Sequence, residues 1–384
     1  MSRSDPEQIS LFEPSVCLSE RAEYFKQQLI TYIGNKRLLL GPIADALKQV
    51  QSETGNKKLQ LFDAFSGSGV VSRLFKSYAS RLVANDLEPY AGVISRCFLA
   101  NETEIDLNII KSVVESINDL TEENLASYPG IIERLYAPSD DNYIKHGERV
   151  FYTRDNARRL DKLRLLIEQQ NKDYRNLLLG PLLSSASIHA NTAGIFKGFY
   201  KDKDTGIGKF GGSGSDALSR IKGKIKLEVP VLSKFQTEFE VYQEDTNKLI
   251  SDVGDFDLAY FDPPYNQHPY GSNYFMLNLL VDYVEPTDIS VVSGIPSDWN
   301  RSLYNKKKHA FEQLSDAVAR VDAKYVLLSF NDEGFVSTNL LRNFLSKIGK
   351  MTELQIKYNT FRGSRNLNSR KIHVTEHLFL VRKY

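Results

Sequence analysis

The sequence predicts an α/β protein in which helices flank a twisted, mostly parallel sheet and a smaller second unit is attached. Short β-prone runs alternate with helical patterns near both ends of the chain, as in βαβ units. Polar residues follow each run, at the sheet edge where open doubly wound sheets bind ligands. The four runs span residues 58–65, 81–84, 256–261 and 324–330.

The order of these elements predicts how the chain is divided. Helical patterns occur at 70–78, after the first run, and at 157–169 in the middle of the chain. With 384 residues, the chain is longer than most single hydrophobic cores. We therefore expect residues 1–100 and 241–384 to build the sheet domain together, and residues 101–240 to form an inserted, largely helical unit.

Composition excludes several classes of protein. The chain is 41% hydrophobic and 25% charged, and no apolar run approaches the roughly 20 residues of a membrane helix. The polar, acidic N-terminus lacks the pattern of a secretory signal, so we expect a cytoplasmic protein without membrane association. Cys17 and Cys97 form neither a disulfide framework nor a metal site, and no metal is expected.

Local charge in the middle of the chain leaves two interpretations open. Residues 193–226 contain eight basic and three acidic side chains, although the net charge of the whole chain is only +1. A Gly- and Lys-rich stretch of this kind is either a solvated flexible loop or a segment that contacts DNA phosphates. Interleaved aromatic residues favour nucleic-acid contact: Phe196, Phe199, Tyr200 and Phe210.

The strongest chemical signal is the tetrapeptide Asp262-Pro263-Pro264-Tyr265, directly after the third β-prone run. Consecutive prolines form a rigid, extended turn, which presents a carboxylate and a carbonyl oxygen in a preset arrangement. The Asp262 carboxylate and the Pro263 carbonyl are suited to accept both hydrogens of an adenine amino group, and Tyr265 offers a face for stacking an extruded base. The alternative is a merely structural turn.

A second signal lies after the first β-prone run, at Phe65-Ser66-Gly67-Ser68-Gly69. Glycines at such a turn let the backbone approach a ligand closely. Asp86 follows about 20 residues later, the spacing of a carboxylate that binds ribose hydroxyls. The next glycine is the distant Gly92, so the three-glycine dinucleotide fingerprint is absent and a nucleoside without a pyrophosphate is favoured.

Together, these motifs resemble the alpha-class, Dam-type DNA adenine methyltransferases at both ends of the chain, leaving roughly the middle third unmatched. The segment Tyr32-Ile33-Gly34-Asn35-Lys36 resembles that family's element for the methionine part of the cofactor. Ser329-Phe330-Asn331-Asp332-Glu333-Gly334 resembles an element beside its base pocket. The resemblance implies a Rossmann-like methyltransferase fold, S-adenosylmethionine as cofactor, methylation of adenine N6 by base flipping, and target recognition by the inserted unit.

The resemblance also implies roles for individual residues. Catalysis falls to Asp262, Pro263, Pro264 and Tyr265. Cofactor contacts fall to Tyr32, Lys36, Asp63, Phe65, Ser66, Gly67, Gly69, Asp86, Asp245 and Asp262. Beside the base pocket or the flipped strand we place Gln267, His268, Tyr270 and Asn273. Expected DNA contacts are Lys197, Lys222, Lys224, Arg362 and Arg365, whereas Lys306–Lys308 is expected to be a solvated face.

Other activities remain as alternatives. A Pro-Pro turn of this kind also serves RNA base methylation, although such enzymes usually lack the N-terminal Tyr-x-Gly-x-Lys element. Cytosine C5 methylation is excluded because neither Cys17 nor Cys97 follows a proline. A catalytically inactive DNA-binding subunit is disfavoured by the intact motifs. We expect double-stranded DNA as the substrate and functional pairing with a restriction endonuclease without a stable complex.

Overall fold

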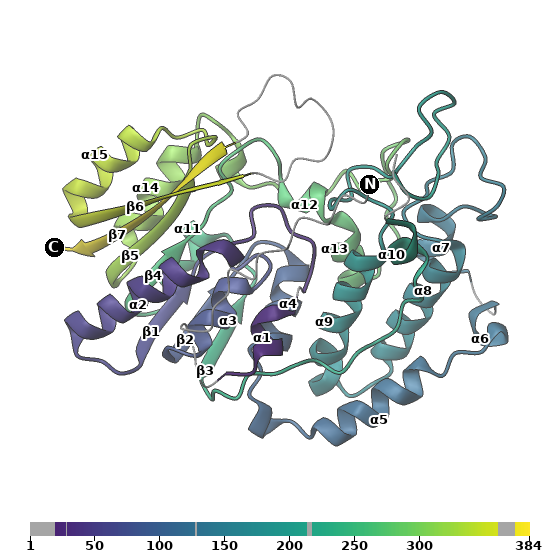
Figure 1. The fold of residues 1–384 in the computed structure, drawn as a ribbon, viewed down its shortest axis with the longest axis horizontal. Coiled ribbons are helices and arrows are strands. Elements are labelled where there is room, and N and C mark those ends of the chain that lie inside the picture. The colour runs from purple at the N-terminus through teal and green to yellow at the C-terminus, as the bar shows by residue number, and fades with distance from the viewer. Residues whose placement is uncertain (1–19, 28, 127–128, 213–216, 360–372) are drawn as a thin grey trace, which may run out of the picture.

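The computed structural model describes residues 20–384 apart from 28, 127–128, 213–216 and 360–372 (Figure 1). A seven-stranded sheet has the order β3-β2-β1-β4-β5-β7-β6. The strands are β1 (Leu59–Asp63), β2 (Ala79–Asn85), β3 (Glu238–Tyr242), β4 (Phe256–Phe261), β5 (Ala323–Asn331), β6 (Gly349–Asn359) and β7 (His373–Lys383). Strands β3, β2, β1, β4 and β5 are parallel and β7 is antiparallel to both its neighbours, so the predicted α/β fold with a mostly parallel sheet is confirmed.

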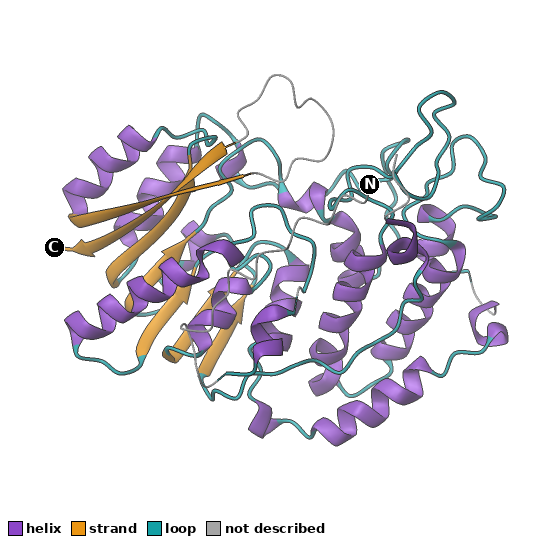
Figure 2. Ribbon diagram, in the orientation of Figure 1, coloured by secondary structure: helices purple, strands orange, loops and turns teal. Residues whose placement is uncertain are grey.

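Helices flank the sheet and fill the middle of the chain. Those of the sheet domain are α1 (Ala22–Lys26), α2 (Leu40–Thr54), α3 (Val70–Lys76), α4 (Pro89–Phe98), α11 (Thr246–Leu249), α12 (Tyr270–Asn273), α13 (Phe275–Asp282), α14 (Ala310–Arg320) and α15 (Thr338–Ile348). Those of the middle region are α5 (Leu107–Asn118), α6 (Glu122–Ala126), α7 (Ile131–Tyr136), α8 (Arg154–Glu168), α9 (Lys172–His189) and α10 (Leu218–Lys222). Short 3₁₀ turns cover Arg37–Leu39, Glu102–Glu104 and Leu303–Asn305. Figure 2 shows the strands in one half of the molecule and the longer middle helices in the other.

The central strands are buried on both faces, which explains why they appear as apolar runs in the sequence. All six residues of β4 are buried. Because side chains alternate along a strand, Leu258 and Tyr260 pack with α2 and α3, whereas Ala259 and Phe261 pack with α14 and α15. Helices on both faces therefore hold the carboxyl ends of β1, β2 and β4 at one edge of the sheet.

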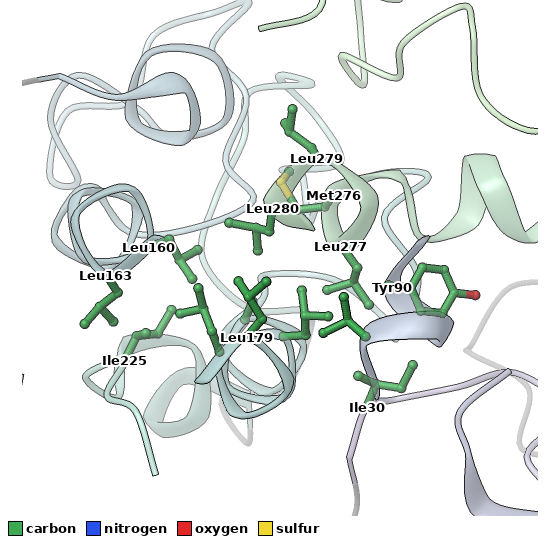
Figure 3. Packing of buried hydrophobic residues seen from close by; sticks show 14 of the residues in the cluster. Ile30, Tyr90, Leu160, Leu163, Leu179, Ile225, Met276, Leu277, Leu279 and Leu280 are labelled. Carbon is green, nitrogen blue, oxygen red and sulfur yellow. The ribbon is translucent and has the colours of Figure 1, made fainter. Parts of the chain in front are cut away.

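The middle helices share a hydrophobic core with the sheet domain. Figure 3 shows side chains of α8, α9 and α13 in this cluster, which also includes Tyr90 of α4. Helices α9 and α4 cross closely at Gly180, where an added Cβ atom would lie only 2.7 Å from the Sγ atom of Cys97. Cys97 is thus a buried packing residue, and α13 joins this core although it follows the Pro-Pro turn in sequence.

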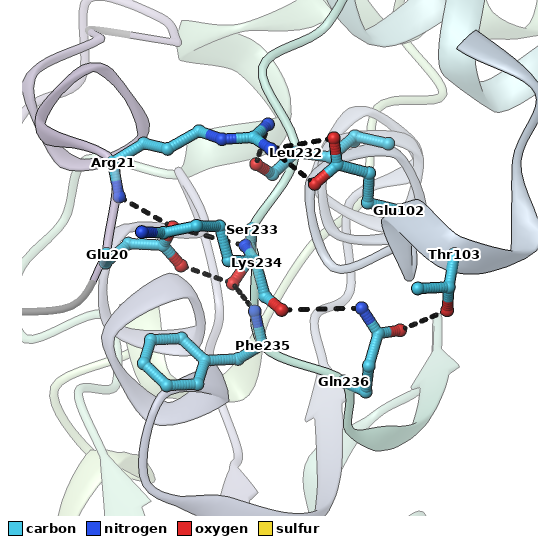
Figure 4. Close-up of polar contacts among 9 residues, drawn as sticks. All are labelled: Glu20, Arg21, Glu102, Thr103, Leu232, Ser233, Lys234, Phe235 and Gln236. Atoms are coloured by element: carbon cyan, nitrogen blue, oxygen red, sulfur yellow. Dashed lines mark hydrogen bonds and ion pairs between the residues drawn. The ribbon is translucent and has the colours of Figure 1, made fainter.

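Polar contacts tie the segment before α1 to the chain that leads into β3 (Figure 4). Arg21 forms an ion pair of 2.6 Å with Glu102, and Glu20 accepts hydrogen bonds from the Ser233 hydroxyl and the Lys234 amide. Strand β3 was not predicted, because its EFEVY sequence is partly exposed at the sheet edge. It crosses residue 240, where we had expected the inserted unit to end.

Candidate active site

A cavity lies at the carboxyl ends of β1, β2 and β4 and brings together segments from both ends of the chain. Its walls come from the N-terminal segment, the loops after these three strands, the turn before α11, and a segment after α13. The lining residues are Tyr32, 34–36, 65–68, Val70, Val71, 86–88, 244–246, Tyr260, Asp262, Pro264, Tyr270, Asn300, Ser302, Tyr304 and Asn305. This edge is where the alternation of strands and polar residues predicts a ligand.

Predicted site residues from both ends of the chain meet in this cavity. Ten of them line it: Tyr32, Lys36, Phe65, Ser66, Gly67, Asp86, Asp245, Asp262, Pro264 and Tyr270. Six others do not line it: Asp63, Gly69, Pro263, Tyr265, His268 and Asn273.

The loop after β1 approaches the N-terminal segment so closely that only glycine fits. Gly67 has a positive φ of 49°, and a Cβ atom there would lie 2.7 Å from the Tyr32 hydroxyl. Its amide donates a 2.8 Å hydrogen bond to Oδ2 of Asp86. The backbone of this loop and the carboxylate after β2 therefore form one continuous wall.

Asp86 is held in place by two backbone amides. The amide of Glu88 donates to Oδ1 of Asp86 at 2.9 Å, which complements the Gly67 bond to Oδ2. Burial raises the pKa of Asp86 to about 6, although these backbone hydrogen bonds oppose that shift. A buried carboxylate with fixed orientation at this position is suited to accept hydrogen bonds from ribose hydroxyls.

Asp63 supports the loop from below. Its side chain is 0% exposed, and the Ser72 hydroxyl of α3 donates a 2.5 Å hydrogen bond to its Oδ2. Burial raises the pKa of Asp63 to about 7, while the Ser72 bond acts in the opposite direction. The Asp63 side chain lies against α3 and does not line the cavity, so its expected direct contact with the cofactor stays a prediction.

Asp262 forms the far wall, at the end of β4. Its Oδ1 lies 2.9 Å from the ammonium nitrogen of Lys36, and Oε1 of Glu376 lies 3.1 Å from the same nitrogen. Burial raises the pKa of Asp262 to about 6; Lys36 lowers it and the Glu376 carboxylate raises it. Sequence reasoning missed Glu376, because the terminal strand β7 carries no motif that connects it with the Pro-Pro turn.

The Tyr265 ring is packed beside the turn. The ring makes an edge contact with Phe330, with ring centroids 5.9 Å apart. The backbone carbonyl of Tyr265 accepts a 2.8 Å hydrogen bond from the Phe335 amide. Burial raises the pKa of Tyr265 to about 12. The segment that starts at Ser329 thus lies beside the Pro-Pro turn, and its expected place beside the base pocket stays a prediction.

Stacked tyrosines join α12 to the N-terminal segment. The Tyr32 ring stacks on Tyr270 and on Tyr274, each at a centroid distance of 5.0 Å. The Tyr274 hydroxyl accepts a 2.8 Å hydrogen bond from the Ile33 amide, and the Tyr270 hydroxyl donates to the Ile33 carbonyl at 3.2 Å. These contacts fix the Tyr-x-Gly-x-Lys element against the cavity.

No sequence motif pointed to the segment 300–305, which lines the cavity near the Asp86 loop. The Asn300 side chain donates to the Leu87 carbonyl at 3.2 Å. The Tyr304 ring packs edge-on against Phe65 at 5.1 Å, and its hydroxyl donates a 2.8 Å hydrogen bond to Asn247. No local pattern marks these residues, because their position depends on contacts with distant loops.

Three of the residues expected near the flipped base lie apart from the cavity: Gln267, His268 and Asn273. The Asn273 side chain is 2% exposed, and its carbonyl accepts a 2.7 Å hydrogen bond from the Phe196 amide. As the last residue of α12, Asn273 is thus packed inside the protein, and its expected contact with substrate finds no support in this geometry. Gln267 and His268 are exposed and do not line the cavity.

The basic middle segment has exposed lysines but buried aromatic residues. Lys197, Lys222 and Lys224 are exposed. Phe196 is 2% exposed, and Phe199 packs edge-on against Phe151 at 5.2 Å. Phe196 is therefore a core residue and Phe199 packs partly buried against the same core, whereas contact of the segment with DNA stays a prediction.

The remaining expectations concern two arginines, metal ligands and membrane-spanning helices. Arg362 and Arg365 lie outside the described residues. Within the described ranges, no three His, Cys, Asp or Glu side chains are grouped as metal ligands. None of the described helices combines the length and apolar character that a bilayer span requires.

The fold and the cavity define a Rossmann-like methyltransferase. A family model for the D12 class N6 adenine-specific DNA methyltransferases matches residues 32–344, which include every segment that lines the cavity. The chain belongs to this family, and it is an enzyme that methylates adenine in DNA at specific sites. DNA is thus its substrate, and the alternatives of an RNA methyltransferase and an inactive subunit are set aside.

Relatives align over nearly the whole chain. The Type II methyltransferase M.NlaIII of Neisseria lactamica is 28% identical over 362 residues, covering 92% of this chain and 99% of the relative. The Type II methyltransferase M.CviAII of Paramecium bursaria Chlorella virus 1 is 27% identical and covers 92% and 98%. The Type II methyltransferase M.FokI of Planomicrobium okeanokoites is 24% identical, and the match covers 92% of this chain and 52% of that protein.

Proposed function

We propose that the cavity binds S-adenosylmethionine and that the Pro-Pro turn holds an adenine flipped out of duplex DNA. The observation that carries this proposal is the meeting of Asp86 and Asp262 on opposite sides of one cavity. Asp86 suits a ribose, and the carboxylate of Asp262 suits a neighbouring positive sulfonium. The aromatic rings of Tyr32 and Phe65 supply apolar walls between them.

Lys36 has a different role from the one that the family resemblance implies. Its ammonium is engaged by Asp262 and Glu376, so we assign it to the organisation of the catalytic turn. For the methionine part of the cofactor we propose Tyr32, Asn35 and the backbone of residues 66–68, which also line the cavity.

The chain's own residues supply orientation and hydrogen-bond acceptors for the reaction. S-adenosylmethionine, when bound, provides the electrophilic methyl group. The Asp262 carboxylate and the Pro263 carbonyl accept the two amino hydrogens of the adenine and localise the lone pair on N6. The N6–C bond forms as the sulfonium S–C bond breaks and leaves a neutral thioether, and the amino group gives up one proton, which the Asp262 carboxylate is suited to accept. The half-buried ring of Tyr265 stacks on the extruded base.

We further propose that the helical region within 101–240 recognises the target sequence. The exposed Lys197, Lys222 and Lys224 supply phosphate contacts there. Relatives named as Type II methyltransferases support a role in restriction-modification. We further propose that the enzyme acts in the cytoplasm and pairs functionally with a nuclease without forming a stable complex.

Transfer of a labelled methyl group from S-adenosylmethionine tests the proposed chemistry. Duplex DNA should be labelled at adenine N6, and single-stranded DNA and RNA serve as parallel substrates. Asp262→Ala should abolish turnover but leave cofactor binding nearly unchanged. Asp252→Ala, at an exposed position after α11, is the control and should remain active. Substantial turnover by Asp262→Ala contradicts the proposed role, and mapping methylated adenines in DNA from expressing cells identifies the recognition sequence.

A further inference from the structure

Glu376 is a buried carboxylate beneath the catalytic turn. It lies on β7 opposite Asn331 of β5 and is 0% exposed. The Ser329 hydroxyl of β5 donates a 2.6 Å hydrogen bond to its Oε1, and the same oxygen lies 3.1 Å from Nζ of Lys36. A strand from the C-terminal end of the chain thereby reaches the active site.

Lys36 is shared between two carboxylates. Its nitrogen lies 2.9 Å from Oδ1 of Asp262 and 3.1 Å from Oε1 of Glu376, and it donates to the Gly34 carbonyl at 3.3 Å. An ammonium group has three N–H donors, so these contacts can use all of them. The Lys36 side chain is 5% exposed. One buried cation therefore serves two acidic groups, and with both ionised the trio carries a net negative charge.

We propose that Glu376 is a positioning residue for methyl transfer. Glu376 shares the Lys36 ammonium with Asp262, so Lys36 stabilises the Asp262 carboxylate less strongly. Asp262 can then accept the hydrogen bond and afterwards the proton of the target amino group. An exclusive Lys36–Asp262 pair would stabilise the ionised carboxylate more strongly and make it a weaker acceptor. This inference rests on the role proposed above for Asp262.

The charged groups around Asp262 determine in which direction its pKa changes when Glu376 is neutralised. The ionisable groups that interact with it are Lys36, Asp63, Tyr260, Tyr265, Tyr270 and Glu376. Lys36 is the cation in this group. Burial and the Glu376 carboxylate raise the pKa of Asp262, and Lys36 lowers it. Removing the negative charge of Glu376 should therefore lower the pKa of Asp262.

The test is the pH dependence of single-turnover methylation by the full-length enzyme with saturating S-adenosylmethionine and duplex DNA. Glu376→Gln keeps the side-chain size and one oxygen acceptor but removes the charge. We expect a severalfold slower rate at the plateau and an acidic limb whose midpoint moves to lower pH by about one unit. Glu376→Asp keeps the charge, and its midpoint should stay close to that of the unmodified enzyme.

A control variant shows whether loss of any carboxylate changes the pH profile, and the unmodified enzyme shows whether the proposed function itself holds. Glu353→Gln on β6 removes a carboxylate that pairs with Arg342 and His377, away from the cavity, and should leave the pH profile unchanged. The inference is overturned if Glu376→Gln keeps the original midpoint, whether or not it is slower, or if Glu376→Asp moves the midpoint as far as Glu376→Gln does. If the unmodified enzyme leaves adenine N6 unlabelled, the proposed function fails instead.

Discussion

Asp63 is predicted to destabilise the folded protein at neutral and alkaline pH, and Asp63→Asn should relieve this. Burial raises the pKa of Asp63 from 3.8 to about 7. As pH rises between these values, the unfolded chain loses the proton while the folded protein keeps it, so the free energy of unfolding falls. Of this window, about 1.5 pH units lie between pH 5.5 and 7, which at about 1.36 kcal/mol per unit corresponds to ~2 kcal/mol.

Urea unfolding at pH 5.5 and pH 8 measures this difference. Asp63→Asn retains an oxygen acceptor for the Ser72 hydroxyl and cannot ionise. At each pH, the stabilisation is the free energy of unfolding of Asp63→Asn minus that of the unmodified protein. This stabilisation should be about 2 kcal/mol larger at pH 8 than at pH 5.5. Asp252→Asn, an exposed substitution, is the control. An Asp63→Asn effect that is the same at both pH values would refute the reasoning, and a large loss of cofactor affinity would support Asp63 as a direct ligand.

Three further predictions concern the cavity and the basic segment. Asp86→Ala should raise the Kd for S-adenosylmethionine by about 10- to 100-fold in calorimetric titration, since hydrogen bonds to charged groups contribute about 1.5–3 kcal/mol; an unaltered Kd removes Asp86 from the ribose site. Gly67→Ala should weaken cofactor binding and lower Tm because of its positive φ and the nearby Tyr32 hydroxyl, whereas Gly55→Ala, with a similar φ and open space, should lower Tm without changing the Kd. Neutralising three exposed lysines should reduce the slope of log affinity against log salt by about 2–3, and an unchanged slope shows that they do not contact phosphate: Lys222, Lys224 and Lys226.

Local sequence patterns predicted the central elements well. The run at 256–261 coincides with β4, and the run at 324–330 lies within β5. Buried parallel strands are recognisable because both faces are apolar, and turn residues mark where they end. The edge strand β3 escaped prediction because its charged residues alternate with apolar ones beside solvent.

Burial of single side chains was harder to predict. Phe196 and Asn273 belong to segments that suggested contact with DNA, yet both are buried where the loop after α9 meets α12. A sequence shows that aromatic and basic residues alternate, but it does not show which of them face a neighbouring element. The lysines of the same segment remain exposed because their charge is costly to bury.

The sequence by itself determined the parallel sheet, the glycine loop with Asp86, and the catalytic turn at Asp262. These depend on neighbouring residues, because strand burial, positive φ and proline geometry are local properties of the chain. Only the tertiary structure decided that Lys36 and Glu376 meet beside Asp262 and that the segment 300–305 lines the cavity. Such contacts depend on strand order and helix packing across the whole chain, and ion pairs between distant residues leave no periodic pattern in the sequence.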